Sequence, residues 1–189
     1  VKRQHRVTDF MTNTQRNIMI TGASRGIGRA IALRIAEPGD CVVVNYLRNK
    51  EAAESTAAAL REKGAEAICV QANVRSEDDL KRLASSVEQV DILVHNAAIG
   101  ALKPYNKLRR NHWDLTLESS LRPFWLLTKL VKFAPEASVL GISSLGSQRY
   151  IPGYAAMGAA KAGMEALTRQ LAVELAAQQV RVNTVCGGL

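Results

Sequence analysis

The sequence has 189 residues, 47% of them hydrophobic, and carries a formal net charge of +8. A chain of this size and composition can bury one sizeable core and is typical of a single domain. No segment approaches the roughly 20 consecutive apolar residues that a membrane-spanning helix needs, and positions 1–10 lack the apolar stretch of a secretion signal, so we expect a cytoplasmic protein. The lysines and arginines are scattered, which argues against a nucleic-acid-binding protein, although the basic surface could attract an acidic protein or an anionic cofactor.

We expect one domain over residues 11–189, preceded by a disordered tail at residues 1–10. The three cysteines, Cys41, Cys69 and Cys186, lie in apolar, strand-like runs without the CxxC spacing or the histidine pair of a metal site. The sequence therefore predicts buried free thiols and no bound metal.

Six short apolar runs, rich in β-branched residues, alternate with longer segments of helical periodicity. The runs occupy residues 18–21, 41–45, 67–71, 91–95, 139–143 and 180–185. Strands that are apolar on both faces and are separated by crossover helices form parallel sheets. The sequence therefore predicts an α/β fold of the Rossmann type, with a doubly wound parallel sheet and helices on both faces.

The first run leads directly into a glycine-rich turn and then into a helix expected at residues 29–37. Glycine lets the chain turn tightly and lets backbone amides approach a pyrophosphate at the helix N-terminus. The expected cofactor contacts in this turn are Gly22, Ser24, Arg25, Gly26, Ile27 and Gly28. Its position between strand and helix makes the motif more specific than glycine spacing alone.

The end of the second run distinguishes the two nicotinamide cofactors. NAD-binding proteins usually carry an acidic residue here for the ribose 2′-hydroxyl, whereas this chain has Asn45, Tyr46, Leu47 and Arg48. Arg25 and Arg48 could bind a 2′-phosphate, so NADPH is preferred to NADH. The alternative that both arginines are merely solvated remains open.

Together with further motifs in the same order, the turn resembles that of the short-chain dehydrogenase/reductase family. The further motifs are Asn73 and Val74 after the third run, His95, Asn96, Ala97 and Ala98 after the fourth, Ser143 and Ser144 after the fifth, and residues 181–185. The resemblance implies that Asn73 and Val74 contact the adenine and that Asn96 and Ala97 also line the cofactor. His95 and Ala98 depart from the family's usual asparagine and glycine.

The tyrosine of most family members lies four residues before a lysine, but here that position is Met157, whose thioether cannot donate a proton. Tyr154 lies seven residues before Lys161. Residues seven apart return to nearly the same helix face, so both can still address one site. This spacing, with the loop that follows Ser143, is similar to that of bacterial enoyl-acyl-carrier-protein reductases, especially the NADPH-using type III enzymes.

The resemblance implies hydride transfer from NADPH to the β-carbon of a trans-2-enoyl thioester, carried by acyl carrier protein or coenzyme A, as in fatty acid synthesis. Tyr154 would stabilise the enolate oxygen and relay a proton. Lys161 would hold the nicotinamide ribose and favour negative charge nearby. Ser144 is expected as a supporting donor, and Tyr150 could border the substrate entrance.

Several residues outside these motifs are interpreted as structural. They are His95, His112, Trp113, Phe124 and Trp125, with the last three expected in the core or at a subunit contact. Ser119 and Ser120 occupy the place of the family's proton-relay asparagine, which weakens a carbonyl-reductase hypothesis. The helix expected near residues 154–177 carries many small side chains and, by resemblance, would pack against a partner subunit in a homotetramer.

The sequence is compatible with three functions. The function that the resemblance favours is that of an NADPH-dependent enoyl-acyl-carrier-protein reductase. The alternative is a short-chain reductase of a ketone, a 3-ketoacyl group or another small carbonyl compound, and the third is a non-catalytic nucleotide-binding protein. The sequence stops at Leu189, where relatives continue into substrate-covering helices and a last strand, so this domain is expected to lack that lid.

Overall fold

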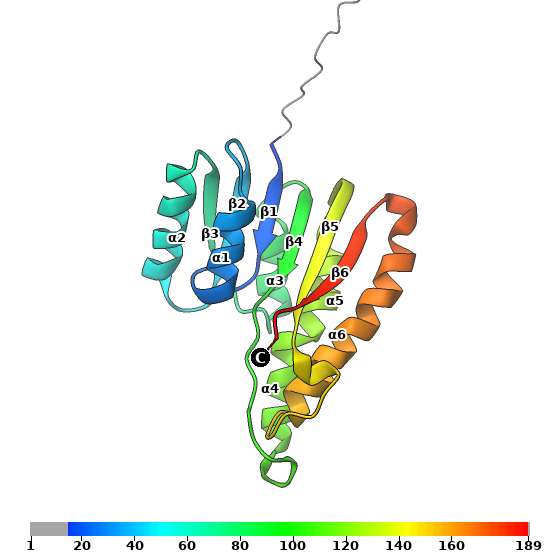
Figure 1. Cartoon of the computed structure of the whole chain (residues 1–189). Coiled ribbons are helices and arrows are strands. Elements are labelled where there is room, and N and C mark those ends of the chain that lie inside the picture. The colour runs from blue at the N-terminus through cyan, green and yellow to red at the C-terminus, as the bar shows by residue number, and fades with distance from the viewer. Residues whose placement is uncertain (1–14, 189) are drawn as a thin grey trace, which may run out of the picture.

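The computed structural model describes residues 15–188, which form one sheet with helices on both sides (Figure 1). The tail expected at residues 1–10 lies outside the described residues. Within the described part, no helix is long and apolar enough to cross a membrane. No group of histidine, cysteine and acidic side chains in residues 15–188 could hold a metal ion. The three cysteines are free, but only Cys41 is buried; Cys69 is half-buried and Cys186 is exposed, so the prediction of buried thiols was wrong for these two.

Six parallel strands form the sheet in the order β3-β2-β1-β4-β5-β6. Their bounds are β1 Asn17–Ile20, β2 Cys41–Tyr46, β3 Glu66–Gln71, β4 Val90–His95, β5 Phe133–Ser143 and β6 Arg181–Cys186. Each strand overlaps one of the six apolar runs, which confirms the predicted doubly wound parallel sheet. The strand order reverses between β1 and β4, and folds of this kind bind ligands at the carboxyl ends of the strands beside that reversal.

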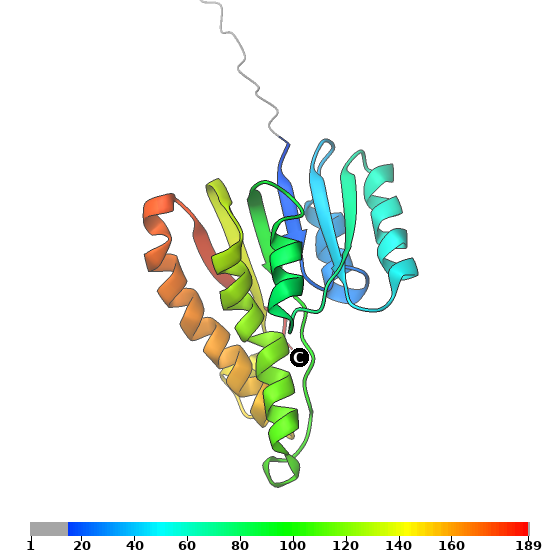
Figure 2. The same cartoon turned by 180° about the vertical axis from the view of Figure 1, so that it is seen from behind.

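The helices cover the two faces of the sheet in two sets (Figures 1 and 2). On one face, α1 (Gly26–Ile35) and α2 (Lys50–Glu62) lie over β1 to β3. The opposite face carries α3 (Glu77–Ala84), α5 (Arg122–Leu130) and α6 (Ala155–Glu174), and α4 (Arg110–Ser120) projects beyond the carboxyl edge of the sheet in line with α5. Short 3-10 turns lie at Tyr105–Lys107, Leu145–Ser147 and Ala176–Gln178.

Alternation along the strands produces two apolar cores. Ile18 and Ile20 of β1 point to the face of α1 and α2, whereas Met19 between them packs with Phe124 of α5 and Met164 of α6 on the other face. All five side chains are fully buried. A central strand must therefore be apolar at every position, which is the pattern that the sequence analysis detected.

The helix after the glycine-rich turn begins earlier than predicted. α1 starts at Gly26 rather than at residue 29 and ends at Ile35 rather than at residue 37. Two glycines argue against a helix when helix propensity is considered alone. In the structure Gly28 packs against the turn so closely that a Cβ would lie 2.3 Å from the carbonyl oxygen of Gly22, so packing decides the boundary.

Strand β5 is longer than predicted, and β6 forms one edge of the sheet. β5 begins at Phe133 rather than at residue 139, because a register shift against β4 between Val90 and Ile92 accommodates the additional residues. Within the described residues, β6 pairs only with β5. The β5 extension could not be recognised from apolar periodicity, since it includes the exposed Glu136 with a φ of 60°.

Candidate active site

Side chains from neighbouring strands hold the glycine-rich turn in place. Asn96, directly after β4, donates from Nδ2 to the carbonyl oxygens of Thr21 at 3.0 Å and Gly22 at 3.1 Å. Thr21 Oγ1 accepts from the amides of Asn96 and Ala97, both at 3.0 Å, and Asn45 Oδ1 accepts from the Gly22 amide at 3.1 Å. Asn96 and Ala97 therefore shape the turn, and their contact with a cofactor stays a prediction.

The turn leaves open space at the start of α1. Gly22 and Gly26 have φ values of 66° and 57°, which favour glycine, and a Cβ on Gly26 would meet no atom within 4 Å. Arg25 and Ile27 are exposed, and Ser24 is half-buried. The first amides of a helix lack partners within the helix, so this open turn fits a diphosphate.

The residues expected near the adenosine lie at the ends of β2 and β3. Arg48 follows β2 and is exposed, as is Arg25 in the glycine-rich turn. Asn73 follows β3, and its Oδ1 accepts from the Arg75 amide at 3.1 Å, while Val74 is nearly buried beside it. The two arginines give this end of the site the charge that a 2′-phosphate would require.

Tyr154 and Ser144 meet at the end of β5. The Tyr154 hydroxyl donates to Ser144 Oγ at 2.9 Å, and Ser144 is 7% exposed. Tyr154 occupies the N-cap position of α6, and its ring packs against Gly146, where a Cβ would lie 2.3 Å from the ring. The structure thus brings together two of the three residues that the sequence predicted as catalytic.

Lys161 reaches the same strand end from the second turn of α6. Its Nζ donates to the carbonyl oxygen of Ile142 at 2.6 Å, and the residue is 5% exposed. Burial lowers the pKa of Lys161 to about 8, so the charged ammonium form still predominates at neutral pH. Tyr154 and Lys161 therefore contact Ser144 and Ile142, two residues apart at the end of β5, and their catalytic roles stay a prediction.

Met157 lies where the resemblance would place a tyrosine. It is 8% exposed, and its Cε packs so closely on Gly100 that a Cβ there would lie 2.2 Å away. The thioether fills this position with an apolar group and offers no proton. Tyr154 is therefore the phenol that contacts Ser144.

His95 has the structural role that the sequence analysis preferred. It is 1% exposed, its Nδ1 lies 3.2 Å from Thr21 Oγ1, and its Nε2 lies 3.2 Å from the carbonyl oxygen of Ser120. Burial first, and the charge of Lys161 second, lower the pKa of His95 to about 3 despite the hydrogen bond to Ser120. A neutral, enclosed imidazole ties β4 to β1 and α4 rather than exchanging protons with a substrate.

The other residues interpreted as structural divide into two groups. His112 Nδ1 accepts from the Arg109 amide at 3.1 Å at the start of α4, and Phe124 is fully buried in the core. Trp113 and Trp125 are 40% and 43% exposed, so a core position was wrong for both and a subunit contact stays a prediction. Ser119 Oγ donates to the carbonyl oxygen of Ile99 at 2.6 Å, which fastens α4 to the loop after β4.

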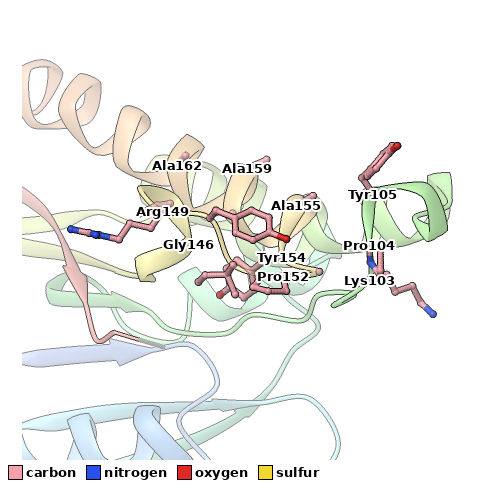
Figure 3. Close-up of a pocket in the computed structure, with 15 residues that line it drawn as sticks. Lys103, Pro104, Tyr105, Gly146, Arg149, Pro152, Tyr154, Ala155, Ala159 and Ala162 are labelled. Carbon is pink, nitrogen blue, oxygen red and sulfur yellow. The ribbon is translucent and has the colours of Figure 1, made fainter.

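A cavity of about 500 Å³ lies beside Tyr154 (Figure 3). One wall is α6, including Ala159, and another is the loop after β5 with Tyr150, which is 89% exposed. Lys103 and Tyr105, from the segment before α4, line the opposite side. Tyr150 thus lines an opening next to Tyr154, and its contact with substrate stays a prediction.

Sequence reasoning missed Glu165, which lies one turn beyond Lys161 on α6. Its Oε1 accepts from Ser143 Oγ at 2.5 Å and from Ser147 Oγ at 2.6 Å, and its Oε2 accepts from Gln148 Nε2 at 3.5 Å. Burial raises the pKa of Glu165, but these hydrogen bonds and the charge of Arg169 together outweigh burial and lower it. The four-residue spacing from Lys161 was a usable signal, because such residues share a helix face.

Three comparisons bear on family membership. The family model described as enoyl-(acyl carrier protein) reductase matches residues 22–189. A 1-cyclohexenylcarbonyl-CoA reductase from Streptomyces collinus is 41% identical, and the match covers 90% of this chain and 63% of that protein. A 3-oxoacyl-(acyl-carrier-protein) reductase from Staphylococcus epidermidis is 34% identical, and the match covers 92% of this chain and 74% of that protein. The structure of a metagenomic short-chain oxidoreductase in complex with NADP is similar at a TM-score of 0.82 and 28% identity, covering 90% of this chain and 81% of that one.

The chain spans less than two thirds of the length of the Streptomyces protein, 74% of the Staphylococcus protein and 81% of the metagenomic oxidoreductase. The match to the family model nevertheless runs from the glycine-rich turn through the last strand, and the fold is similar to that of the solved relative at a TM-score of 0.82. These agreements show that the chain belongs to the short-chain dehydrogenase/reductase family.

Proposed function

We propose that the chain forms the core of an NADPH-dependent reductase of thioester-linked acyl groups. The observation that carries the proposal is the convergence of Tyr154, Ser144 and Lys161 at the end of β5. Strands β5 and β1 both end at the carboxyl edge of the sheet, so these side chains share that edge with the glycine-rich turn.

The chain's own residues suit NADPH. Gly22, Gly26 and the amides that begin α1 would hold the diphosphate, and Arg25 and Arg48 would pair with the 2′-phosphate. The related short-chain oxidoreductase in complex with NADP supports the same choice. When bound, NADPH supplies the hydride.

The hydroxyl groups of Tyr154 and Ser144 provide the proton and the electrostatic support. Ser144 Oγ accepts from Tyr154 and keeps its own proton free to donate. A substrate oxygen within reach of both would accept a hydrogen bond from Ser144 and take the proton of Tyr154. The buried charge of Lys161 at the same strand end would favour negative charge on the oxygens during this transfer.

The comparisons favour carbonyl reduction, which was the alternative in the sequence analysis. Several relatives that are 34% to 36% identical to this chain are 3-oxoacyl-(acyl-carrier-protein) reductases. For a 3-oxoacyl thioester, the oxygen addressed by Tyr154 would be that of the C3 carbonyl, and protonation there would give a hydroxyl group.

Reduction of a conjugated carbon–carbon double bond is the second candidate. The family model carries an enoyl reductase description, and the 41% identical relative is named for an unsaturated acyl-CoA. Met157, where a tyrosine would be usual, leaves Tyr154 to act from a position one turn earlier. In this reaction Tyr154 would protonate the enolate formed at the thioester oxygen.

A parallel assay of both substrates distinguishes these candidates. NADPH oxidation would be followed by absorbance with 3-oxoacyl and trans-2-enoyl thioesters, each on acyl carrier protein and on coenzyme A, for the wild type and for Tyr154→Phe. We expect turnover of one class and its loss in Tyr154→Phe, with Tyr46→Phe, a tyrosine of β2 away from the cavity, as the matched control that keeps turnover. Binding of NADPH without turnover of either class would instead support a non-catalytic nucleotide-binding protein.

A further inference from the structure

Glu165 binds both sides of the segment that carries Ser144. Ser143 Oγ, immediately before Ser144, donates to Glu165 Oε1 at 2.5 Å, and Ser147 Oγ, three residues after it, donates to the same oxygen at 2.6 Å. Gln148 adds a longer bond of 3.5 Å to Oε2. A single carboxylate on α6 therefore anchors the end of β5 and the 3-10 turn Leu145–Ser147 together.

These bonds are charge-assisted, so they are stronger than hydrogen bonds between neutral groups. Ser147 has one hydroxyl proton and two acceptors within reach, the carbonyl oxygen of Ser144 at 2.8 Å and the Glu165 carboxylate. The negative charge favours the bond to Glu165. Without the carboxylate, Ser147 would turn to Ser144, and Ser143 would lose its bond across to α6.

The anchored turn also supports Tyr154. Gly146, in the middle of the turn, packs directly on the Tyr154 ring, and its amide donates to Ser144 Oγ at 3.3 Å. A shift of the turn would therefore move the ring and change the 2.9 Å bond between the Tyr154 hydroxyl and Ser144 Oγ.

We propose that Glu165 is a positioning residue, which holds the turn after β5 so that the Ser144 and Tyr154 hydroxyl groups address the same substrate oxygen. This role rests on the proposed reductase function. Glu165 itself is occupied by hydroxyl and amide donors from the chain, so it acts through Ser144 and Tyr154 rather than on the substrate.

The first test uses fluorine NMR and does not depend on turnover. All four tyrosines would be replaced by 3-fluorotyrosine, and the Tyr154 resonance would be assigned from the Tyr154→Phe protein. Glu165→Ala should shift or broaden the Tyr154 resonance while that of Tyr46, buried in β2, stays in place. Glu165→Gln, which keeps an acceptor oxygen, should restore the Tyr154 resonance, and Glu174→Ala, an exposed glutamate of the same helix, should leave it unchanged.

An unchanged Tyr154 resonance in folded Glu165→Ala protein would overturn the proposal, whatever the enzyme does. If Glu165→Ala does not fold, the same NMR measurement is made on Ser147→Ala, which removes one of the two hydroxyl donors to Glu165. This variant should still shift or broaden the Tyr154 resonance, and an unchanged resonance would overturn the proposal. In a turnover assay with the accepted substrate, Glu165→Ala should lower kcat at least about tenfold with KM little changed, as expected for a misplaced catalytic group. Glu165→Gln should retain more of the wild-type kcat than Glu165→Ala, and equal kcat values in the two variants would contradict positioning by hydrogen bonds.

Discussion

Lys161 holds its charge in a nearly buried position against a neutral partner, the carbonyl oxygen of Ile142. Burial of an ammonium group disfavours the charged form, which is why its pKa falls to about 8. If the ammonium group holds the nicotinamide ribose, its effect is present below this pH and disappears above it.

We therefore expect the affinity for NADPH to decrease as the pH rises through about 8. The measurement is a binding titration by cofactor fluorescence at several pH values on either side. Lys161→Met should bind more weakly and show no such dependence. The prediction fails if the decrease has the same size in both proteins.

His95 makes the fold sensitive to acid. The unfolded chain binds a proton at the ordinary pKa of histidine, 6.5, whereas native His95 does not until about 3, so the unfolded state binds more protons between these values. The free energy of unfolding should therefore fall as the pH decreases below 6.5, by about 1.4 kcal/mol per pH unit. Urea unfolding between pH 6.5 and about 5 measures this slope before most carboxylates titrate.

His95→Asn provides the matched comparison, because asparagine keeps hydrogen-bonding groups but does not titrate. Its unfolding free energy should change much less over the same pH range. Parallel slopes for the two proteins would show that another group causes the acid sensitivity.

At the scale of elements, the junction of β1 with α1 depends on close backbone packing. A Cβ at residue 28 would lie 2.3 Å from the Gly22 oxygen, so Gly28→Ala should displace the turn. We expect a stability loss on the order of 1–3 kcal/mol, as for overpacking, together with weakened NADPH binding. Gly187→Ala is the control, since a Cβ there meets nothing within 4 Å, and equal effects of the two substitutions would refute the argument.

The sequence predicts those elements whose signal is local. Apolar runs located all six strands, and helical periodicity placed Tyr154 and Lys161 at one strand end. The start of α1 and the early part of β5 depend on contacts with other segments, so local patterns misplaced both. For Glu165 the spacing from Lys161 indicated a shared helix face, but its hydrogen bonds to Ser143 and Ser147 form only when α6 meets the turn after β5.

At the scale of the whole molecule, part of the surface of α6 is exposed. Ala155 and Ala159 are exposed small residues on this helix, and Val173 near its end is 77% exposed. Small side chains allow helices of two subunits to approach closely. The homotetramer implied by the family resemblance would use such a surface.

Light scattering coupled to gel filtration tests this prediction. We expect the wild type to have the mass of a homotetramer and Ala159→Arg, which places a long charged side chain on α6, to have a smaller mass. A wild-type chain that elutes as a monomer, or a variant that assembles unchanged, would contradict the use of this helix.

The outer edge of β6 gives the sheet a second kind of surface. Within the described residues β6 pairs with β5 alone, so the backbone groups along its other side face outward over Arg181–Cys186. Such an edge is a template for one further strand, whichever chain supplies it. A short synthetic peptide of extended conformation should therefore be able to add one strand to this sheet.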